Sequence, residues 1–128
     1  ITEKCLYAVI DVIGPGCKLW EVSDAVQKLA EKHGYGLVRE YAGHGIGTRM
    51  HEDPQVPNYV DMSSRYAELT LRPGMVICVE PMLNLGVSDV DVLDDGWTVV
   101  TSDRKVSAHF EHTIAVTEDG AEILTIAA

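Results

Sequence analysis

The spacing of apolar residues changes once along the chain, near Gly34, and this change limits the folds that the chain can adopt. Apolar residues follow a helical spacing over Thr2–Ile13 and again over Leu19–His33, so each segment is predicted to form an amphipathic helix. The Gly-Pro-Gly sequence at 14–16 should end the first helix, because proline cannot continue the helical hydrogen bonds. Gly34 should end the second helix in a left-handed conformation.

Beyond Gly34, short apolar runs separated by turn residues are typical of strands. The predicted strands cover Tyr35–Tyr41, Met75–Glu80, Trp97–Thr101, Val106–Thr117 and Ala121–Ile126. Arg49–Asp61 contains two prolines and is predicted to be irregular, and the aspartate-rich segment Gly86–Gly96 reads as an exposed loop or hairpin. Helices followed by antiparallel strands predict an α+β fold, in which two helices pack on one face of an antiparallel sheet.

Length and charge narrow the class of protein. With 128 residues, the chain is expected to form one domain over 1–128, large enough to bury a core. A net charge of −10 argues against nucleic-acid binding, for which a basic face would be expected. No apolar run is as long as a membrane span, and no secretory signal is expected at the start of the sequence.

The cysteines indicate a reducing compartment. Cys5, Cys17 and Cys78 are an odd number and contain no CxxC pair, so disulfides are not expected and a cytoplasmic location fits best. Cys5 and Cys78 lie within apolar patterns and are predicted to act as small core side chains.

Histidines and glutamates at the ends of apolar runs suggest a metal site. His44 and His51 lie in the glycine-rich segment 43–56, which we expect to form a turn around His44. Glu80 ends one apolar run, and Glu111 interrupts another. A buried glutamate is destabilising unless it is paired or coordinated, so imidazole and carboxylate together favour a divalent metal. The alternatives are a structural His44 and a Glu80 that caps its strand at the rim of the sheet.

These residues fall in an ordered set of motifs: HGIG, MHEDPQV, PGMVICVEPM, DGWTV and SAHFEHTIAVTEDGAEILT. The set resembles the C-terminal half of a type I methionine aminopeptidase, over nearly the whole chain. The resemblance implies half of a pita-bread fold. It also implies removal of N-terminal methionine from peptides or proteins, with water activated by a divalent ion. The ion could be manganese, iron, cobalt or zinc.

The resemblance also assigns roles to individual residues. His44, Glu80 and Glu111 would hold the metal, and Glu80 would assist proton transfer. His51 would contact the scissile amide and stabilise the tetrahedral intermediate, with a structural loop histidine as the alternative. Met50 and Trp97 would line the methionine pocket, unless they belong to the core.

The resemblance covers only about half of the family's catalytic domain. The other half supplies two aspartate ligands, which neither Asp11 nor Asp24 matches. His109 stands where the family usually has glutamine and could be an extra ligand, whereas His112 is expected to be structural.

A homodimer or a complementary N-terminal half would be needed to complete the active site. The alternative function is non-catalytic: an isolated or engineered half-fold that self-associates and binds metal or peptide.

Overall fold

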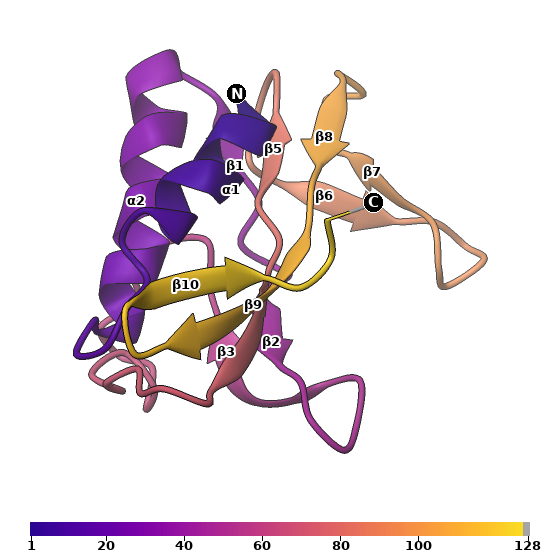
Figure 1. Ribbon diagram of the computed structural model, residues 1–128. Coiled ribbons are helices and arrows are strands. Elements are labelled where there is room, and N and C mark those ends of the chain that lie inside the picture. The colour runs from indigo at the N-terminus through magenta and orange to yellow at the C-terminus, as the bar shows by residue number, and fades with distance from the viewer. Residues whose placement is uncertain (127–128) are drawn as a thin grey trace.

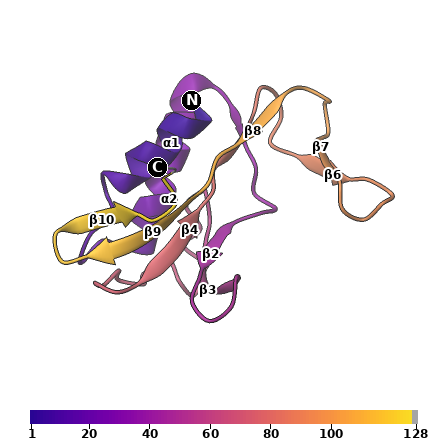
Figure 2. The ribbon, with the colours of Figure 1, turned by 45° about the vertical axis from the view of Figure 1, so that its right-hand side comes forward.

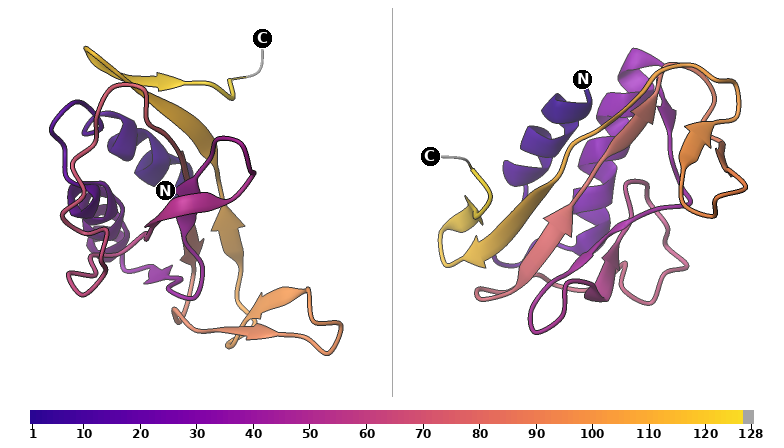
Figure 3. Two further views of the ribbon diagram at one scale, coloured as in Figure 1. Left: turned by 90° about the horizontal axis from the view of Figure 1, so that it is seen from below. Right: turned by 90° about the vertical axis from the view of Figure 1, so that its right-hand side faces the viewer.

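A computed structural model describes residues 1–126 of the chain. Two helices, α1 (Thr2–Ile10) and α2 (Leu19–His33), lie next to each other and cover one face of a set of antiparallel strands (Figures 1 and 3). This is the predicted α+β arrangement.

The first helix is shorter than predicted. It ends at Ile10 rather than Ile13, and the amides of Val12 and Ile13 both donate to the carbonyl oxygen of Val9, each at 3.0 Å, in a closing turn. Ile13 is nevertheless buried, with 3% of its surface exposed. The apolar spacing therefore continues into the turn, and for this reason it could not mark the end of the helix.

The second helix has the predicted bounds and the predicted end. At its start, the Lys18 amide donates to the Glu21 carboxylate at 2.7 Å. At its end, Gly34 has a φ of 69°, which glycine adopts without strain. None of the helices in residues 1–126 is long and apolar enough to cross a membrane.

The larger sheet has five antiparallel strands in the order β10-β9-β4-β2-β3. Their bounds are β2 Gly43–Gly45, β3 Glu52–Val56, β4 Val76–Val79, β9 His112–Thr117 and β10 Gly120–Ile123. Strands distant in sequence, such as β2 and β9, both pair with β4 and so lie on either side of it.

The remaining strands form two smaller units. β1 (Gly36–Leu37), β5 (Met82–Asn84) and β8 (Ser107–His109) make a three-stranded sheet in the order β1-β5-β8. β6 (Val90–Val92) and β7 (Val99–Thr101) form a hairpin that projects away from the helices (Figure 2). The hairpin includes the aspartate-rich segment, in agreement with one of the two predictions made for it.

Several of these predictions need correction. Only Gly36–Leu37 of the predicted strand Tyr35–Tyr41 is paired in a strand. Arg49–Asp61 is not wholly irregular, because it contains β3, whose Pro54 is tolerated at the edge of the sheet where its missing N–H costs no ladder bond. The predicted strand Val106–Thr117 is interrupted at residues 110–111, between β8 and β9. The last strand ends at Ile123 rather than at Ile126.

The core lies between the helices and the larger sheet. It combines the predicted helix faces with alternate residues of β4 and β9: Leu6, Val9, Val22, Val26, Ala30, Ile77, Val79, Ile114 and Val116. Cys5 and Cys78 are buried, as predicted, with 0% and 1% of their surfaces exposed. Because Ile77 and Val79 face the helices, the side chains of Cys78 and Glu80 lie on the opposite face.

Candidate metal centre

The candidate centre lies where two pairs of strands bend. The pairing of β4 with β9 and that of β5 with β8 follow one register. Glu80 lies in the gap between β4 and β5, and Glu111 lies in the gap between β8 and β9. Continuing the shared register places the two glutamates opposite each other. The predicted long strand is therefore interrupted at the position where Glu111 joins the candidate site.

His44 comes from the next strand of the same sheet. It occupies the middle of β2, directly opposite Cys78 of β4, and so lies on the face of the sheet that points away from the helices. Three strands thus bring His44, Glu80 and Glu111 to one place, although up to 67 residues separate them in sequence.

The glycines beside His44 act differently from the prediction. We expected a turn, but Gly43 and Gly45 belong to β2, between β3 and β4. A Cβ atom on Gly43 would overlap the carbonyl oxygen of Cys78, and one on Gly45 would overlap that of Asp53. The glycines therefore let neighbouring backbones approach closely on both sides of the histidine.

The His44 ring is oriented by its own backbone. Its Nδ1 lies 2.9 Å from the carbonyl oxygen of Gly45, which can only accept a hydrogen bond, so Nδ1 is the protonated nitrogen when this bond forms. Nε2 then keeps its lone pair and lies 3.6 Å from Oε1 of Glu80. The Gly45 carbonyl is thus the acceptor that a histidine ligand usually has at the ring nitrogen away from the metal.

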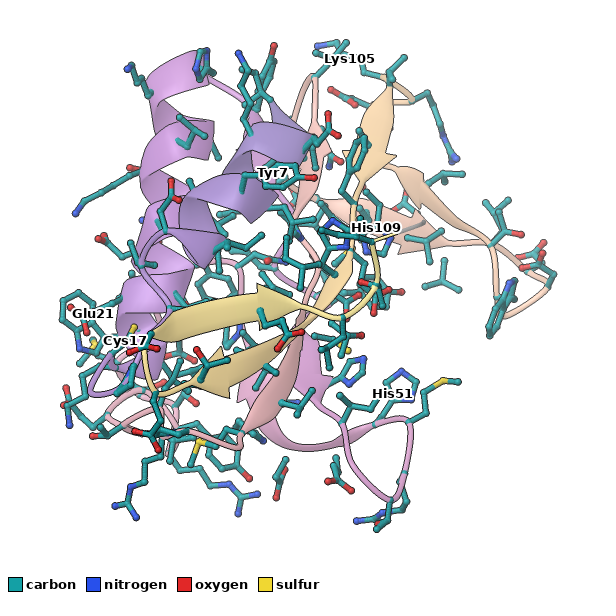
Figure 4. The ribbon with its side chains drawn as sticks, in the orientation of Figure 1. Tyr7, Cys17, Glu21, His51, Lys105 and His109 are labelled. Atoms are coloured by element: carbon teal, nitrogen blue, oxygen red, sulfur yellow. The ribbon has the colours of Figure 1, made fainter. Side chains whose placement is uncertain are left out.

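The second carboxylate oxygen of Glu80 faces another imidazole. Oε2 lies 3.3 Å from Nε2 of His109, and this hydrogen bond raises the pKa of His109. The side chain of Glu80 is only 14% exposed, so the two rings enclose its carboxylate. Figure 4 shows His109 at the end of β8, and His51 beside the loop that follows β2.

Glu111 is close to the other candidates but is not buried. We expected it inside an apolar strand, whereas it is exposed, because the chain between β8 and β9 leaves the ladder there. Even so, one carboxylate oxygen of Glu111 lies within 4.8 Å of ligand atoms of Glu80 and His109, and likewise of His44 and Cys78.

Cys78 is a neighbour of the site that sequence reasoning treated only as a core residue. Its thiol lies on the same face as Glu80, and alternation along the strand could have revealed this. Burial, with the charges of Glu111 and Glu80 nearby, raises the pKa of the Cys78 thiol. The free protein therefore holds it protonated at neutral pH, and a thiol is a poor metal ligand.

The donor set fits a divalent ion. Glu80, His109 and Glu111 form one group whose ligand atoms lie within 4.8 Å of one another, and His44, Cys78 and Glu111 form a second. Imidazole nitrogen and carboxylate oxygen are donors that borderline divalent metals accept. Two carboxylates so close together repel each other unless a proton or a cation lies between them. A cation at this position would remove that repulsion.

His51 lies beside His44, whereas Met50 does not. The His51 ring lies beside that of His44, with 4.2 Å between centroids, and both line a hollow of about 900 Å³. Met50 is 71% exposed, so it is not a core residue, and it does not line that hollow.

Trp97 is also not a core residue, since 87% of its surface is exposed. It lies in the β6–β7 connection and borders a mainly apolar hollow of about 470 Å³, together with Tyr41, Glu80 and His109. The structure thus brings Trp97, but not Met50, to a hollow that Glu80 also lines.

The remaining candidates lie outside the centre. His112 faces α1, where its ring meets Tyr7 edge-on at 6.0 Å and its Nδ1 lies 2.9 Å from Thr125 Oγ1, which fits a structural residue. Asp24 forms an ion pair with Lys28 on α2. Within residues 1–126, no aspartate belongs to a group of three or more side chains able to hold a metal.

Comparison with known proteins gives this geometry a context. A family model described as "Metallopeptidase family M24" matches residues 1–118. The chain is 48% identical to methionine aminopeptidase of Escherichia coli K12 over 98% of its own length and 47% of that protein. It is also 48% identical to methionine aminopeptidase A of Synechocystis, of which it covers 49%. The chain therefore spans about half the length of these curated relatives.

Solved structures show the same similarity to methionine aminopeptidases. Methionine aminopeptidase from Thermotoga maritima superposes with a TM-score of 0.92 at 46% identity, over 99% of this chain and 50% of that one. The enzyme from Rickettsia prowazekii gives 0.90 at 47% identity, over 98% and 50%. The predicted fold, half of the pita-bread arrangement, is therefore confirmed. By sequence and structure alike, the chain belongs to metallopeptidase family M24, as a partial domain that resembles methionine aminopeptidase.

Proposed function

We propose that the chain is the metal-binding half of a peptidase that removes N-terminal methionine from peptides or proteins. The observation that carries this proposal is the meeting of His44, Glu80 and Glu111 on one face of the sheet. We assign these three residues to a divalent ion, which could be manganese, iron, cobalt or zinc, because all four accept nitrogen and oxygen ligands. Such an ion would polarise a carbonyl group and activate water.

Two side chains beside the ion would take part in the reaction. Glu80 is partly buried and lies within reach of two imidazoles, so it can accept a proton and return it. His51 lines the same hollow as His44 without facing Glu80, and we assign it to the scissile amide. A hydrogen bond from its ring to the carbonyl oxygen would strengthen as negative charge develops there.

The methionine side chain would lie against the hollow that Trp97 borders. Its lining is mainly apolar, and Glu80 at one edge links it to the metal ligands. We retain Met50 as a second wall. Because Met50 is 71% exposed in this half, it would contact substrate only after a partner surface covers it.

A partner must complete the active site under this proposal. The chain spans about half of its curated relatives, and no aspartate within residues 1–126 joins the metal group. We propose either a complementary N-terminal half or a second copy of this chain as that partner. The three free cysteines fit a reducing compartment such as the cytoplasm.

A second candidate is a non-catalytic module that binds metal or peptide and self-associates. The exposure of Trp97 beside one hollow and the exposure of Met50 favour it, since exposed aromatic and thioether side chains are common at binding surfaces.

One experiment separates the two functions. Metal content and hydrolysis of a Met-Ala peptide are measured for the 128-residue chain, with and without the N-terminal half of the Escherichia coli relative. Bound metal together with hydrolysis, in either mixture, supports the peptidase. Bound metal without hydrolysis in both mixtures favours the binding module, and absence of bound metal contradicts the proposed site.

A further inference from the structure

His109 lies at the metal centre but has no role in the function proposed above. Its ring comes from β8, a strand of the smaller sheet, whereas His44 comes from β2 of the larger one. The two imidazoles approach Glu80 from different strands, one at each carboxylate oxygen. Glu111 lies within 4.8 Å of ligand atoms of both histidines.

Glu80, His109 and Glu111 have the spacing of ligands of a single ion, since one ligand atom of each lies within 4.8 Å of those of the other two. Four ligands placed tetrahedrally at about 2.1 Å from zinc are about 3.4 Å apart. Nε2 of His109 lies 3.3 Å from Oε2 of Glu80, and Nε2 of His44 lies 3.6 Å from Oε1, so a Glu80 that binds through both oxygens could share the ion with both rings.

We propose that His109 is a fourth protein ligand, so that two histidines and two glutamates hold one divalent ion within this chain. The inference rests on the proposed metal site and extends it. It does not require the missing aspartates, because four protein ligands already complete a tetrahedral site.

A second imidazole should also change which metal is preferred. Imidazole suits zinc, whereas carboxylate and water suit manganese. His109 should therefore increase affinity for Zn²⁺ more than affinity for Mn²⁺.

The test compares Zn²⁺ and Mn²⁺ binding by calorimetry, in the metal-free 128-residue chain and in its His109→Gln variant. Glutamine keeps a polar side chain of similar length but provides no imidazole. We expect His109→Gln to weaken Zn²⁺ binding about tenfold or more, with a smaller effect on Mn²⁺. His33→Gln is the matched control, because His33 is exposed at the end of α2 and stacks only on Tyr35.

Direct coordination is read separately by nitrogen NMR of the histidine rings. Zn²⁺ should shift the Nε2 resonance of His109, identified as the signal that His109→Gln lacks. Equal Zn²⁺ affinity in wild type and His109→Gln, with that resonance unmoved, would overturn the inference.

Variants of the other ligands separate this inference from the proposed function. If His44→Ala and Glu111→Gln lose Zn²⁺ while His109→Gln retains it, the three-ligand site stands and only the fourth ligand is wrong. If the wild-type chain binds neither ion, both proposals fail together. Selective loss of Zn²⁺ affinity in His109→Gln supports the fourth ligand.

Discussion

The imidazole rings of His44 and His51 lie 4.2 Å apart, centroid to centroid, and are inclined at 56° to each other. They differ in their other contacts. His44 faces Glu80, and its second ring nitrogen is held by a backbone carbonyl. His51 is exposed at the rim of the hollow that both rings line. Neighbouring histidines can therefore serve separate functions, one for the metal and one for substrate.

The first prediction follows from this separation. His51→Ala should keep the metal content of wild type, and in any mixture that hydrolyses Met-Ala it should lower kcat about 10²–10³-fold, the usual effect of removing one transition-state donor. His44→Ala should lose the metal itself. Metal content and kinetics measured on the same samples check both. Loss of metal in His51→Ala would mean that the two roles are exchanged.

Glu111 gives the second prediction. Glu111→Gln keeps the shape of the side chain but removes its charge. It should reduce Mn²⁺ or Co²⁺ affinity by about tenfold or more, because loss of a metal ligand should cost at least as much as loss of a residue that hydrogen-bonds to a ligand. Glu122→Gln is the control, since Glu122 is an exposed strand residue on β10. Calorimetry that gives the same affinity for both variants would remove Glu111 from the site.

The close packing of β2 gives the third prediction. Gly43→Ala should lower the free energy of unfolding by about 1–3 kcal/mol, because the added methyl group overlaps the backbone of Cys78 and this backbone cannot move without disturbing the sheet. Gly14→Ala is the matched control, with its nearest neighbour at an ordinary 3.6 Å. Urea unfolding of both variants measures the difference, and equal stability would mean that β2 and β4 separate easily.

The fourth prediction concerns pH. Burial and the nearby carboxylate of Glu21 raise the pKa of the Cys17 thiol from 9.0 to about 11 (Figure 4 shows the two side chains together). At pH 8, Cys17 should thus react with iodoacetamide about 100-fold more slowly than an ordinary thiol, because only the thiolate reacts.

The same shift affects stability. The Cys17 thiol binds its proton more tightly in the folded state than in the unfolded state. Its contribution to the free energy of unfolding is therefore fully present below pH 9 and is lost as the pH rises toward 11. Cys17→Ser should therefore show a shallower fall in stability over this range. A peptide-resolved alkylation rate for Cys17 that rises near pH 9 instead would contradict the assignment.

The second helix and three of the candidate ligands could be picked out from the sequence because local patterns specify them. Apolar residues spaced at the helical period of 3.6 predicted α2. The order of the motifs pointed to His44, Glu80 and Glu111 as candidate ligands. The approach of His109 to Glu80 could not be predicted. It depends on the β4–β9 pairing and the β5–β8 pairing having the same register, which the sequence does not reveal. The same register leaves Glu111 exposed at the bend, although alternation within a continuous strand predicted a buried residue.

The fifth prediction concerns assembly. The two hollows beside the candidate ligands are lined in part by exposed side chains with large apolar surfaces, namely Trp97, Val99 and Tyr41, which are 87%, 40% and 39% exposed. Apolar side chains gathered beside a candidate active site are typical of a surface that another protein covers. A second copy of the chain could cover it, and a two-fold dimer would place the two metal centres close to each other.

Sedimentation velocity at micromolar concentration should therefore show a dimer or a larger oligomer. Val99→Glu should weaken the association, because Val99 lines the second hollow and the change places a charge within the apolar contact, adding to the repulsion between chains that already carry a net charge of −10 each. Val12→Glu provides the control: Val12 is similarly exposed, at 43%, but lies in the turn after α1. If wild type sediments as a compact monomer of 14.0 kDa, a homodimer cannot complete the active site, and the complementary N-terminal half remains the only proposed partner.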